Sequence, residues 1–237
     1  MYWIWKNAPK EDYLGLVHYR RYFVADSLFA QNVADDILGE EKIREILKTH
    51  DIILPELGWK SVKSGVLYRN LKREEQDVSL SILEDIIKEK YPQDLDSYRN
   101  VAYGYKIYHG NMFIAKDDVF RGYAQWLFDL FDELEKRMIA AGDPITPRFF
   151  GYVSEYMIAV YAHSRIARDR IAHCSVAMIT DTSSTGKVPY GLKKAVKKTA
   201  VYRALNERKK RKQYVSKRIA YGKKVEDDVL TGKVFRI

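Results

Sequence analysis

The sequence is poor in cysteine and has no long hydrophobic run. Cys174 is the single cysteine of 237 residues, so the chain cannot form an intramolecular disulfide or a zinc site built from several cysteines. The opening segment, Met1–Asn7, is too short an apolar run for a signal peptide, and no stretch approaches the roughly 20 apolar residues that cross a bilayer. These absences predict a cytoplasmic protein that is soluble or peripheral to a membrane.

Acidic residues are scarce at one end of the chain. From Gly191 to Ile237 there are 16 lysines and arginines against 4 acidic residues, a net charge of +12, whereas the first 190 residues carry a net charge of −3. The overall charge of +9 therefore comes from the tail. An anionic partner is to be sought there.

The apolar pattern predicts an α/β fold, a mixed sheet flanked by helices. Apolar residues make up 46% of the chain, enough for a packed core. Helices are predicted at Glu40–Thr49, from Ser81 to before Pro92, at Val119–Ile139 and from Thr146 to about His163. Strands are predicted at Val17–Val24, Asp51–Pro55 and Lys106–Lys116, and a long loop at Leu57–Asp77. The predicted domains are a main domain (residues 1–180), a linker (181–190) and a basic, partly helical tail (191–237).

Three residues of the last predicted helix share one face. Thr146 can cap this helix, and Pro147 suits its first position. Arg148, Gly151 and Glu155 follow at spacings of three and four residues. Arg148 at a helix N-terminus can bind phosphate, Gly151 permits close approach by a ligand or another backbone, and Glu155 is a candidate general base. A salt bridge between Arg148 and Glu155 explains the same spacing.

The first predicted strand carries charges that are unusual in a buried strand. Alternation gives two faces, one with His18, Arg20 and Tyr22 and the other with Tyr19 and Arg21. One arginine then faces a cleft, where a cation can stabilise a departing diphosphate, and the other braces a carboxylate behind the sheet. A strand end or a bulge can instead bring both together. Two arginines that merely cover the sheet edge are the alternative.

Polar residues also interrupt the strand predicted at Lys106–Lys116. Gly110 indicates a bulge or a close backbone approach. Asn111 can donate to a ligand hydroxyl or a phosphate, or it can satisfy a buried backbone group. His109 precedes them and is a further candidate for binding substrate.

The sequence gives little support for a metal site. The pairs Asp35–Asp36 and Asp117–Asp118 resemble metal ligands, but acidic pairs more often supply charge to a helix N-terminus. His163, His173 and Cys174 lack the rest of a metal site or a catalytic triad, so structural roles are expected. No cofactor is indicated, and a divalent metal ion is compatible with the sequence without being indicated by it.

Five segments together resemble one family. They are Tyr-Trp-Ile-Trp-Lys-Asn (2–7), His-Tyr-Arg-Arg-Tyr-Phe (18–23), Ile-Leu-Pro (53–55), Asn-Met-Phe-Ile (111–114) and Arg-Phe-Phe-Gly-Tyr-Val-Ser-Glu (148–155). In this order they resemble the bacterial capsular and exopolysaccharide biosynthesis glycosyltransferases, a family that includes β-1,3-galactofuranosyltransferases. The resemblance covers roughly Tyr2–Ser164. It implies a GT-A-like fold, a nucleotide-sugar donor such as a UDP-sugar, and a glycan or lipid-linked glycan acceptor.

The resemblance favours eight site positions, which are Tyr19, Arg20, Arg21, Asp77, Asn111, Arg148, Gly151 and Glu155. His18, Tyr22 and His109 are added from the two predicted strands, and the hypothesis of sugar transfer assigns a role to each residue. The donor diphosphate would be held by Arg20, Arg21, Arg148 and Gly151. Glu155 or Asp77 would deprotonate the acceptor hydroxyl. Substrate contacts would come from His18, Tyr19, Tyr22, His109 and Asn111. Members of this family usually have a further N-terminal segment that contains the first strand, so an incomplete or degenerate nucleotide site is expected here.

Two further interpretations concern partners. A catalytically inactive polysaccharide-assembly or glycan-binding partner is the alternative to an enzyme. For the basic tail, anionic lipid on the inner face of the plasma membrane is favoured over nucleic acid, because the implied acceptors include a lipid-linked glycan. A solvated charged segment without a partner is the alternative.

Overall fold

Helices and short strands alternate in the computed structural model, which describes residues 1–27, 30–59, 74–103, 106–108, 110–142, 145, 149–179, 195, 199–210 and 212. The helices are α1 (Tyr2–Asn7), α2 (Glu40–Thr49), α4 (Glu74–Lys90), α5 (Leu95–Tyr103), α6 (Asp117–Ala141) and α7 (Phe149–Arg165). Short 3-10 helices span Ala34–Asp36, Pro92–Asp94 and Arg168–Arg170. The strands are β1 (Tyr13–Leu16), β2 (Arg21–Val24), β3 (Ile52–Pro55), β4 (Gly58–Trp59), β5 (Lys106–Ile107), β6 (Phe113–Lys116) and β7 (Ile171–Met178). Residues 200–210 form a further helix. In this described part, no helix is long and apolar enough to cross a membrane.

The larger sheet is mixed and has the strand order β1-β6-β3-β7-β2, while β4 and β5 form a separate pair. β3 and β7 are parallel, and the other three neighbouring pairs are antiparallel. The carboxyl ends of β1, β3 and β7 therefore lie at the same edge as the amino ends of β6 and β2. We call this edge the carboxyl edge of the sheet.

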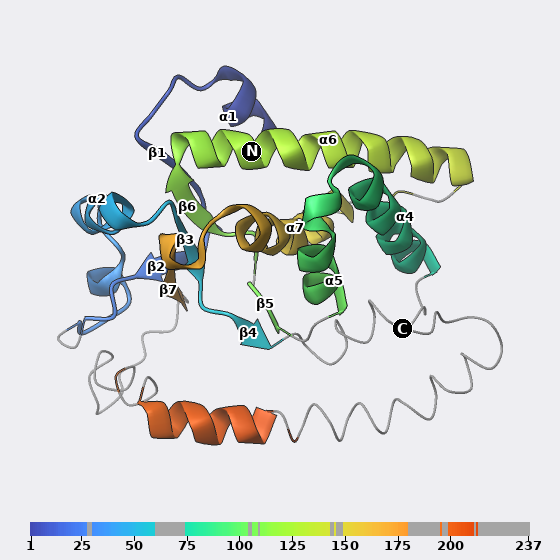
Figure 1. The fold of residues 1–237 in the computed structure, drawn as a ribbon. Helices are drawn as coiled ribbons and strands as arrows, with labels where there is room; N and C mark the ends of the chain where they lie inside the picture. Colours follow the sequence, from blue (N-terminus) through green and yellow to red (C-terminus); the bar gives the residue numbers. More distant parts are fainter. Residues whose placement is uncertain are drawn as a thin grey trace.

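Apolar side chains from alternate strand positions fill two layers. On β3, Ile52 and Leu54 belong to the larger core, which also contains buried residues of α4, α5, α6 and α7. Ile53 belongs to a smaller core that includes Leu47 of α2. Successive strand residues point to opposite faces, so a single strand supplies both layers. Figure 1 shows α2 on one side of the sheet and the longer helices on the other, so the predicted α/β class is confirmed.

Three predicted elements are confirmed. α2 has the predicted bounds Glu40–Thr49, and β3 lies within the predicted strand before Glu56. α6 contains the predicted helix, and its apolar stripe from Phe120 to Met138 is buried. The predicted i,i+4 pair is present on α6, with Arg137 Nε 2.8 Å from Glu133 Oε1.

α4 begins earlier than its capping-box spacing predicted. The spacing predicted a start near Ser81, whereas the helix begins at Glu74. Glu84 lies inside this helix and so cannot cap its start, and its Oε1 atom accepts a hydrogen bond from Arg99 Nε at 2.7 Å. The loop predicted at Leu57–Asp77 is therefore wrong at both ends, since β4 and α4 enter it.

Two long strands predicted from the sequence are each divided. The chain turns between His18 and Arg21, so only the Arg21–Val24 part of the predicted strand Val17–Val24 is a strand, β2. β1 ends before it at Leu16, and β1 and β2 are the two outermost strands of the sheet. The segment Lys106–Lys116 is divided at Gly110, whose φ of +69° lies in the left-handed region that a strand cannot contain. β5 therefore joins the small sheet and β6 the large one.

A buried carboxylate holds the C-terminal end of α7 against α6. Asp94 is fully buried, and its Oδ2 atom accepts hydrogen bonds from Trp126 Nε1 at 2.9 Å and from Arg165 Nη2 at 2.7 Å. A buried charge is tolerated only when it is paired and hydrogen-bonded in this way. With its C-terminal end fixed, α7 presents its first turns to the carboxyl edge.

The opposite edge of the sheet is closed by ion pairs. Asp51 precedes β3, and its Oδ1 atom lies 2.6 Å from Arg170 Nη2 and 2.8 Å from Lys116 Nζ. The hydrogen bond from Arg170 lowers the pKa of Asp51 to about 2. These contacts join the start of β3, the end of β6 and the residue before β7.

Candidate functional site

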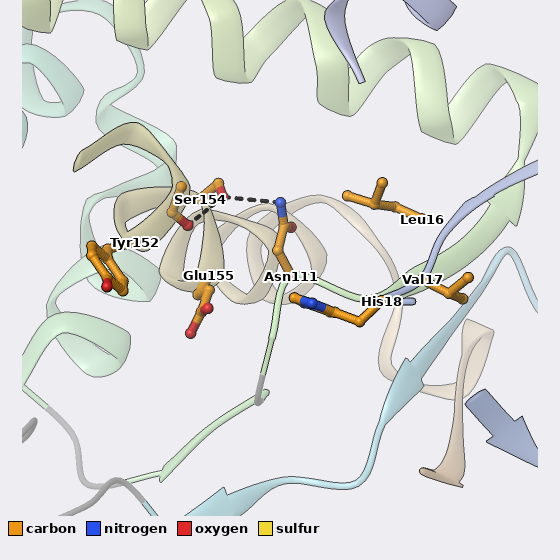
Figure 2. Close-up of a pocket in the computed structure, with 8 residues that line it drawn as sticks. Leu16, Val17, His18, Asn111, Tyr152, Ser154 and Glu155 are labelled. Atoms are coloured by element: carbon orange, nitrogen blue, oxygen red, sulfur yellow. Dashed lines mark hydrogen bonds between the residues drawn. The ribbon is translucent and has the colours of Figure 1, made fainter. Parts of the chain in front are cut away.

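A pocket of about 230 Å³ opens at the carboxyl edge. Its lining residues are Leu16, Val17 and His18 at the end of β1, Asn111 before β6, and Gly151, Tyr152, Ser154 and Glu155 on α7 (Figure 2). Leu16 pairs with Phe113, so the chain leaves β1 and enters β6 at neighbouring positions. Open α/β sheets bind ligands outside the carboxyl ends of their strands, which is where this pocket lies.

Four residues predicted from the sequence meet in this pocket. His18, Asn111, Gly151 and Glu155 come from three separate segments of the chain. Figure 2 shows Asn111 between the half-buried side chain of Glu155 and that of His18. The pocket thus combines a carboxylate, an amide and an imidazole.

Hydrogen bonds orient the amide of Asn111. Ser154 Oγ donates to the carbonyl oxygen of Gly151 at 2.8 Å, so its lone pairs are left to accept from Asn111 Nδ2 at 2.9 Å. Asn111 Oδ1 is then buried with no hydrogen-bond partner among the described residues. A buried acceptor without a donor is unfavourable. The unpaired atom of Asn111 is therefore an acceptor, whereas the sequence predicted a donor to a ligand or a partner for a buried backbone group.

Gly110 brings two basic side chains beside the pocket. Its φ is +69°, and a Cβ atom at this position would lie 2.8 Å from Arg21 Nη1 and 2.9 Å from His18 Nε2. Glycine suits this backbone conformation, and a larger residue here would displace the ends of the Arg21 and His18 side chains. The sequence predicted a bulge or a close backbone approach at Gly110, whereas two side chains approach it, and the Arg21 guanidinium lies next to the segment that carries Asn111.

Gly151 leaves space at the first turn of α7. The sequence offered two reasons for a glycine here, the approach of another backbone or that of a ligand. A Cβ atom at Gly151 would meet no described atom within 4 Å, so no described backbone requires the glycine. Gly151 also lines the pocket, and the approach of a ligand to this turn stays a prediction.

A protein-family model matches most of the chain, including the residues of this pocket. The model described as a domain of unknown function, DUF4422, matches residues 1–166. The chain belongs to the DUF4422 family. No curated protein matches the chain.

A solved structure has a similar fold. It is an apo structure of WbbM, described as a bifunctional glycosyltransferase, with a TM-score of 0.58 and 18% sequence identity. The similarity covers 79% of this chain and 37% of the WbbM chain, so this chain spans just over a third of WbbM's length. At this identity the similarity concerns the fold. The mixed sheet and helices of this DUF4422 member are thus arranged as in part of a glycosyltransferase.

The turn after β1 keeps three other predicted site residues of this DUF4422 member, Tyr19, Arg20 and Tyr22, out of the pocket lining. Tyr19 is 83% exposed, and the Arg20 guanidinium lies 5.5 Å from the centre of its ring. Tyr22 Oη donates to the carbonyl oxygen of Tyr19 at 3.3 Å. These three residues are not among the described residues that line the pocket. The predicted alternation of faces is wrong, because it is a turn that brings His18 and Arg21 together.

Three predicted site residues of the DUF4422 segment are not placed. Arg148 and His109 lie outside the described residues. Asp77 belongs to α4, but its side chain is outside the described part of the structure. Their assignments, and the alternative salt bridge between Arg148 and Glu155, remain predictions.

Sequence reasoning missed four residues that line the pocket in this DUF4422 member, Leu16, Val17, Tyr152 and Ser154, of which the last two carry polar side-chain groups. Ser154 holds the Asn111 amide, and Tyr152 lies beside Gly151 on α7. Both fall inside the quoted segment 148–155. A serine three residues after Gly151, next to the candidate base, was the available signal, because i and i+3 positions share a helix face.

His163 and His173 meet at a buried tyrosine elsewhere in this DUF4422 chain. Tyr108 Oη lies 2.9 Å from His163 Nε2 and 3.0 Å from His173 Nε2. Burial raises the pKa of Tyr108 to about 12 and lowers the pKa of both histidines below their usual range. These bonds join the segment after β5 to α7 and β7, which fits the structural roles predicted for the histidines.

The acidic pairs take part in local structure. Asp117 and Asp118 lie in the first turn of α6, as predicted, and Asp117 Oδ2 accepts from Arg121 Nε at 2.8 Å. Asp36 Oδ1 accepts from the backbone of Ser27 at 2.7 Å. Within the described ranges, no three His, Cys, Asp or Glu side chains are grouped to hold a metal ion.

Proposed function

We propose that this protein transfers a sugar from a nucleotide-sugar donor to the hydroxyl of a glycan acceptor. One observation carries the proposal: Glu155, Asn111 and His18 converge in a pocket at the carboxyl edge of the sheet, in a fold similar to part of a glycosyltransferase. Such a transfer needs a base at the acceptor, an acceptor atom for sugar hydroxyls and a cation at the leaving diphosphate. The pocket and its border supply candidates for all three.

Glu155 is the proposed base. It lies on the second turn of α7, is half-buried and faces the same space as Asn111. A carboxylate in this position can accept the proton of an acceptor hydroxyl as that oxygen attacks the anomeric carbon. Attack in a single displacement inverts the configuration at that carbon. Asp77 is the second candidate predicted from the sequence.

Asn111 is proposed to recognise a sugar. Its amide nitrogen is engaged by Ser154, which leaves the buried Oδ1 atom to accept from a hydroxyl group. Sugars present hydroxyl donors and phosphates at neutral pH present acceptors, so this atom favours the sugar over the diphosphate. Gly151 provides room beside it.

Arg21 is proposed to face the donor diphosphate. Its guanidinium packs against Gly110, next to Asn111, and carries a permanent positive charge. Arg20 and Arg148 are further candidates for this role. Charge developing on the leaving diphosphate is stabilised by such cations, so Arg21 supplies from the protein what a metal ion supplies in other enzymes.

A finer proposal concerns the substrates. The five segments that resemble capsular and exopolysaccharide glycosyltransferases support a UDP-sugar donor, with galactofuranose as the first sugar to test. They also support a cell-surface polysaccharide as the acceptor.

The proposal is tested with the purified chain and a panel of nucleotide sugars. Binding is measured by calorimetry, and transfer to synthetic oligosaccharides by mass spectrometry. Arg21→Gln is expected to weaken binding of the donor and of UDP alone. Asn111→Leu is expected to raise the KM for a sugar substrate and to leave UDP binding unchanged, because its Oδ1 atom serves a hydroxyl.

The matched control is Arg99→Gln, which removes the same charge from α5, where Arg99 pairs with Glu84. This variant is expected to behave as wild type. If no nucleotide sugar binds or is consumed, the proposed function is wrong.

A further inference from the structure

The helix at residues 200–210 has an unusual distribution of exposed side chains. It begins at Thr199, whose Oγ1 atom accepts a hydrogen bond from the backbone of Tyr202 at 3.3 Å, a helix N-cap. Ten of its eleven residues are exposed, and Asn206 is half-buried. Figure 1 shows this helix in orange, away from the helices that cover the sheet.

The polar residues of this helix mark the side that faces the protein. Arg203 Nη2 lies 3.5 Å from Glu56 Oε1, at the carboxyl end of β3. Asn206 follows Arg203 by three residues and therefore lies on the same side of the helix. This side is polar, whereas a helix that packs on a protein core buries an apolar face.

The apolar residues of the helix point to solvent. Val201 is 71% exposed and Leu205 is 61% exposed. They are four residues apart, which places them one above the other on a single stripe. Burying both would stabilise the protein, and the described part of the chain leaves them exposed, so this stripe has the pattern of a surface that binds a partner.

Basic residues continue the same stripe. Arg208 follows Leu205 by three residues, and Lys209 follows it by four, so both lie on the same face. Arg208 and Lys209 are exposed, with the polar ends of their side chains free to extend beyond the apolar pair. The helix lies in the segment from Gly191 onward, whose net charge is +12.

We propose that this face binds the surface of an anionic lipid membrane. A membrane surface uses both features at once: the two apolar side chains enter the boundary between head groups and acyl chains, and the basic side chains meet anionic head groups. A nucleic acid would use the charge and leave Val201 and Leu205 in water. A stripe of two apolar residues gives shallow, reversible attachment, which holds the pocket near a membrane without inserting the chain.

The proposal is tested by sedimentation of the full chain with vesicles. One set is made of equal parts phosphatidylglycerol and phosphatidylcholine, and the other of phosphatidylcholine alone. Wild type is expected to sediment with the anionic set, and less at high salt. Arg208→Gln with Lys209→Gln is expected to weaken binding by about fivefold per charge removed. Val201→Ser with Leu205→Ser is expected to weaken it by a similar factor.

The matched control is Ile139→Ser on α6, which removes an equally exposed apolar side chain (65%) from another surface. It is expected to leave vesicle binding unchanged. Because all these side chains are exposed, urea unfolding midpoints are expected to match wild type, which separates lost binding from lost folding. The proposal is overturned if wild type does not bind anionic vesicles, if the Val201 and Leu205 double variant binds as wild type does, or if the chain shifts RNA in a gel but does not bind vesicles.

Discussion

Asn111 Nδ2 lies 2.9 Å from Ser154 Oγ, and this hydrogen bond joins the segment before β6 to the second turn of α7. Two parts of the chain that are 43 residues apart thereby form one wall of the pocket. The bond also fixes which atom of the Asn111 amide is left for a ligand. The position of Asn111 therefore depends on a serine that need not touch the substrate.

Replacing Ser154 tests this dependence. Ser154→Ala leaves the buried Asn111 amide without its acceptor, so the free energy of unfolding is expected to fall by about 1–3 kcal/mol. The KM for the sugar substrate is expected to rise as the amide loses its orientation. Ser164→Ala is the control, because Ser164 bonds only within α7, to Val160 O and Tyr161 O, in the contacts described. An equal effect of both variants on KM would contradict a positioning role for Ser154.

Substitution of Gly151 is expected to change stability and activity in opposite directions. Gly151→Ala places a methyl group where no described atom lies within 4 Å, so the protein itself does not resist the change. Helix propensity predicts a gain in unfolding free energy of about 1 kcal/mol. If a ligand approaches this turn, turnover falls while stability rises. Thermal unfolding and transfer rates measured side by side check both, with Gly39→Ala, which is also uncrowded, as the activity control. Unchanged turnover would remove the ligand-based reason for Gly151.

A comparison of Gly110 with Gly142 separates the effect of the side-chain contacts at Gly110 from the effect of backbone strain. Gly110 and Gly142 both have left-handed φ values, +69° and +75°, but only Gly110 is crowded, by Arg21 and His18. Alanine at either position is expected to cost about 1–2 kcal/mol of backbone strain. Only Gly110→Ala is expected to weaken donor binding, because the added methyl group displaces the ends of the Arg21 and His18 side chains. Donor affinity that falls equally in Gly142→Ala would show that the loss is a general effect of destabilisation.

The lowered pKa of Asp51 predicts that part of the folding stability is lost in acid. Its folded pKa of about 2 lies below the unfolded value of 3.8, so its contribution is complete above about pH 4 and is lost as the pH falls from about 4 to 2. Asp51→Asn is expected to lower the unfolding free energy at pH 7 by about 1–2 kcal/mol, allowing for partial solvent screening. The difference from wild type should vanish near pH 2.

Urea unfolding across this pH range is the measurement. Glu45→Gln, which breaks an exposed ion pair with Lys42, is the control and should change stability little. A difference for Asp51→Asn that does not depend on pH would contradict the assignment.

The elements that the sequence predicted well are those with a clear period. Ile43, Ile46 and Leu47 have helical spacing, and they pack in the small core from an α2 with the predicted bounds. β3 is a short apolar run ended by proline, and it is buried on both faces. In these segments local preference and tertiary packing agree.

The elements that were predicted poorly from the sequence depend on contacts between distant segments of the chain. The turn at Tyr19 and Arg20 contains no glycine or proline, so its residues predicted a continuous strand. The pairing of β1 with β6 and of β2 with β7 overrides that preference. Ser81 and Glu84 match a capping box, but they lie inside α4, where Glu84 binds Arg99.

The candidate site was predictable in its residues and not in its geometry. Four of its residues were named from spacing and resemblance, yet the pairing of Leu16 with Phe113, which brings them together, has no local signal. The role of Asn111 depended on a partner 43 residues away. Sequence patterns therefore indicated which residues to examine, and the sheet topology decided which of them meet.

The most direct test of the proposed function is sugar transfer by Glu155→Gln. If Glu155 is the base in this pocket, kcat is expected to fall by about 10²- to 10⁴-fold while donor binding is retained. Glu135→Gln, the same change at an exposed position of α6, should transfer sugar at the wild-type rate. Wild-type turnover by Glu155→Gln would contradict the assignment of sugar transfer to this pocket.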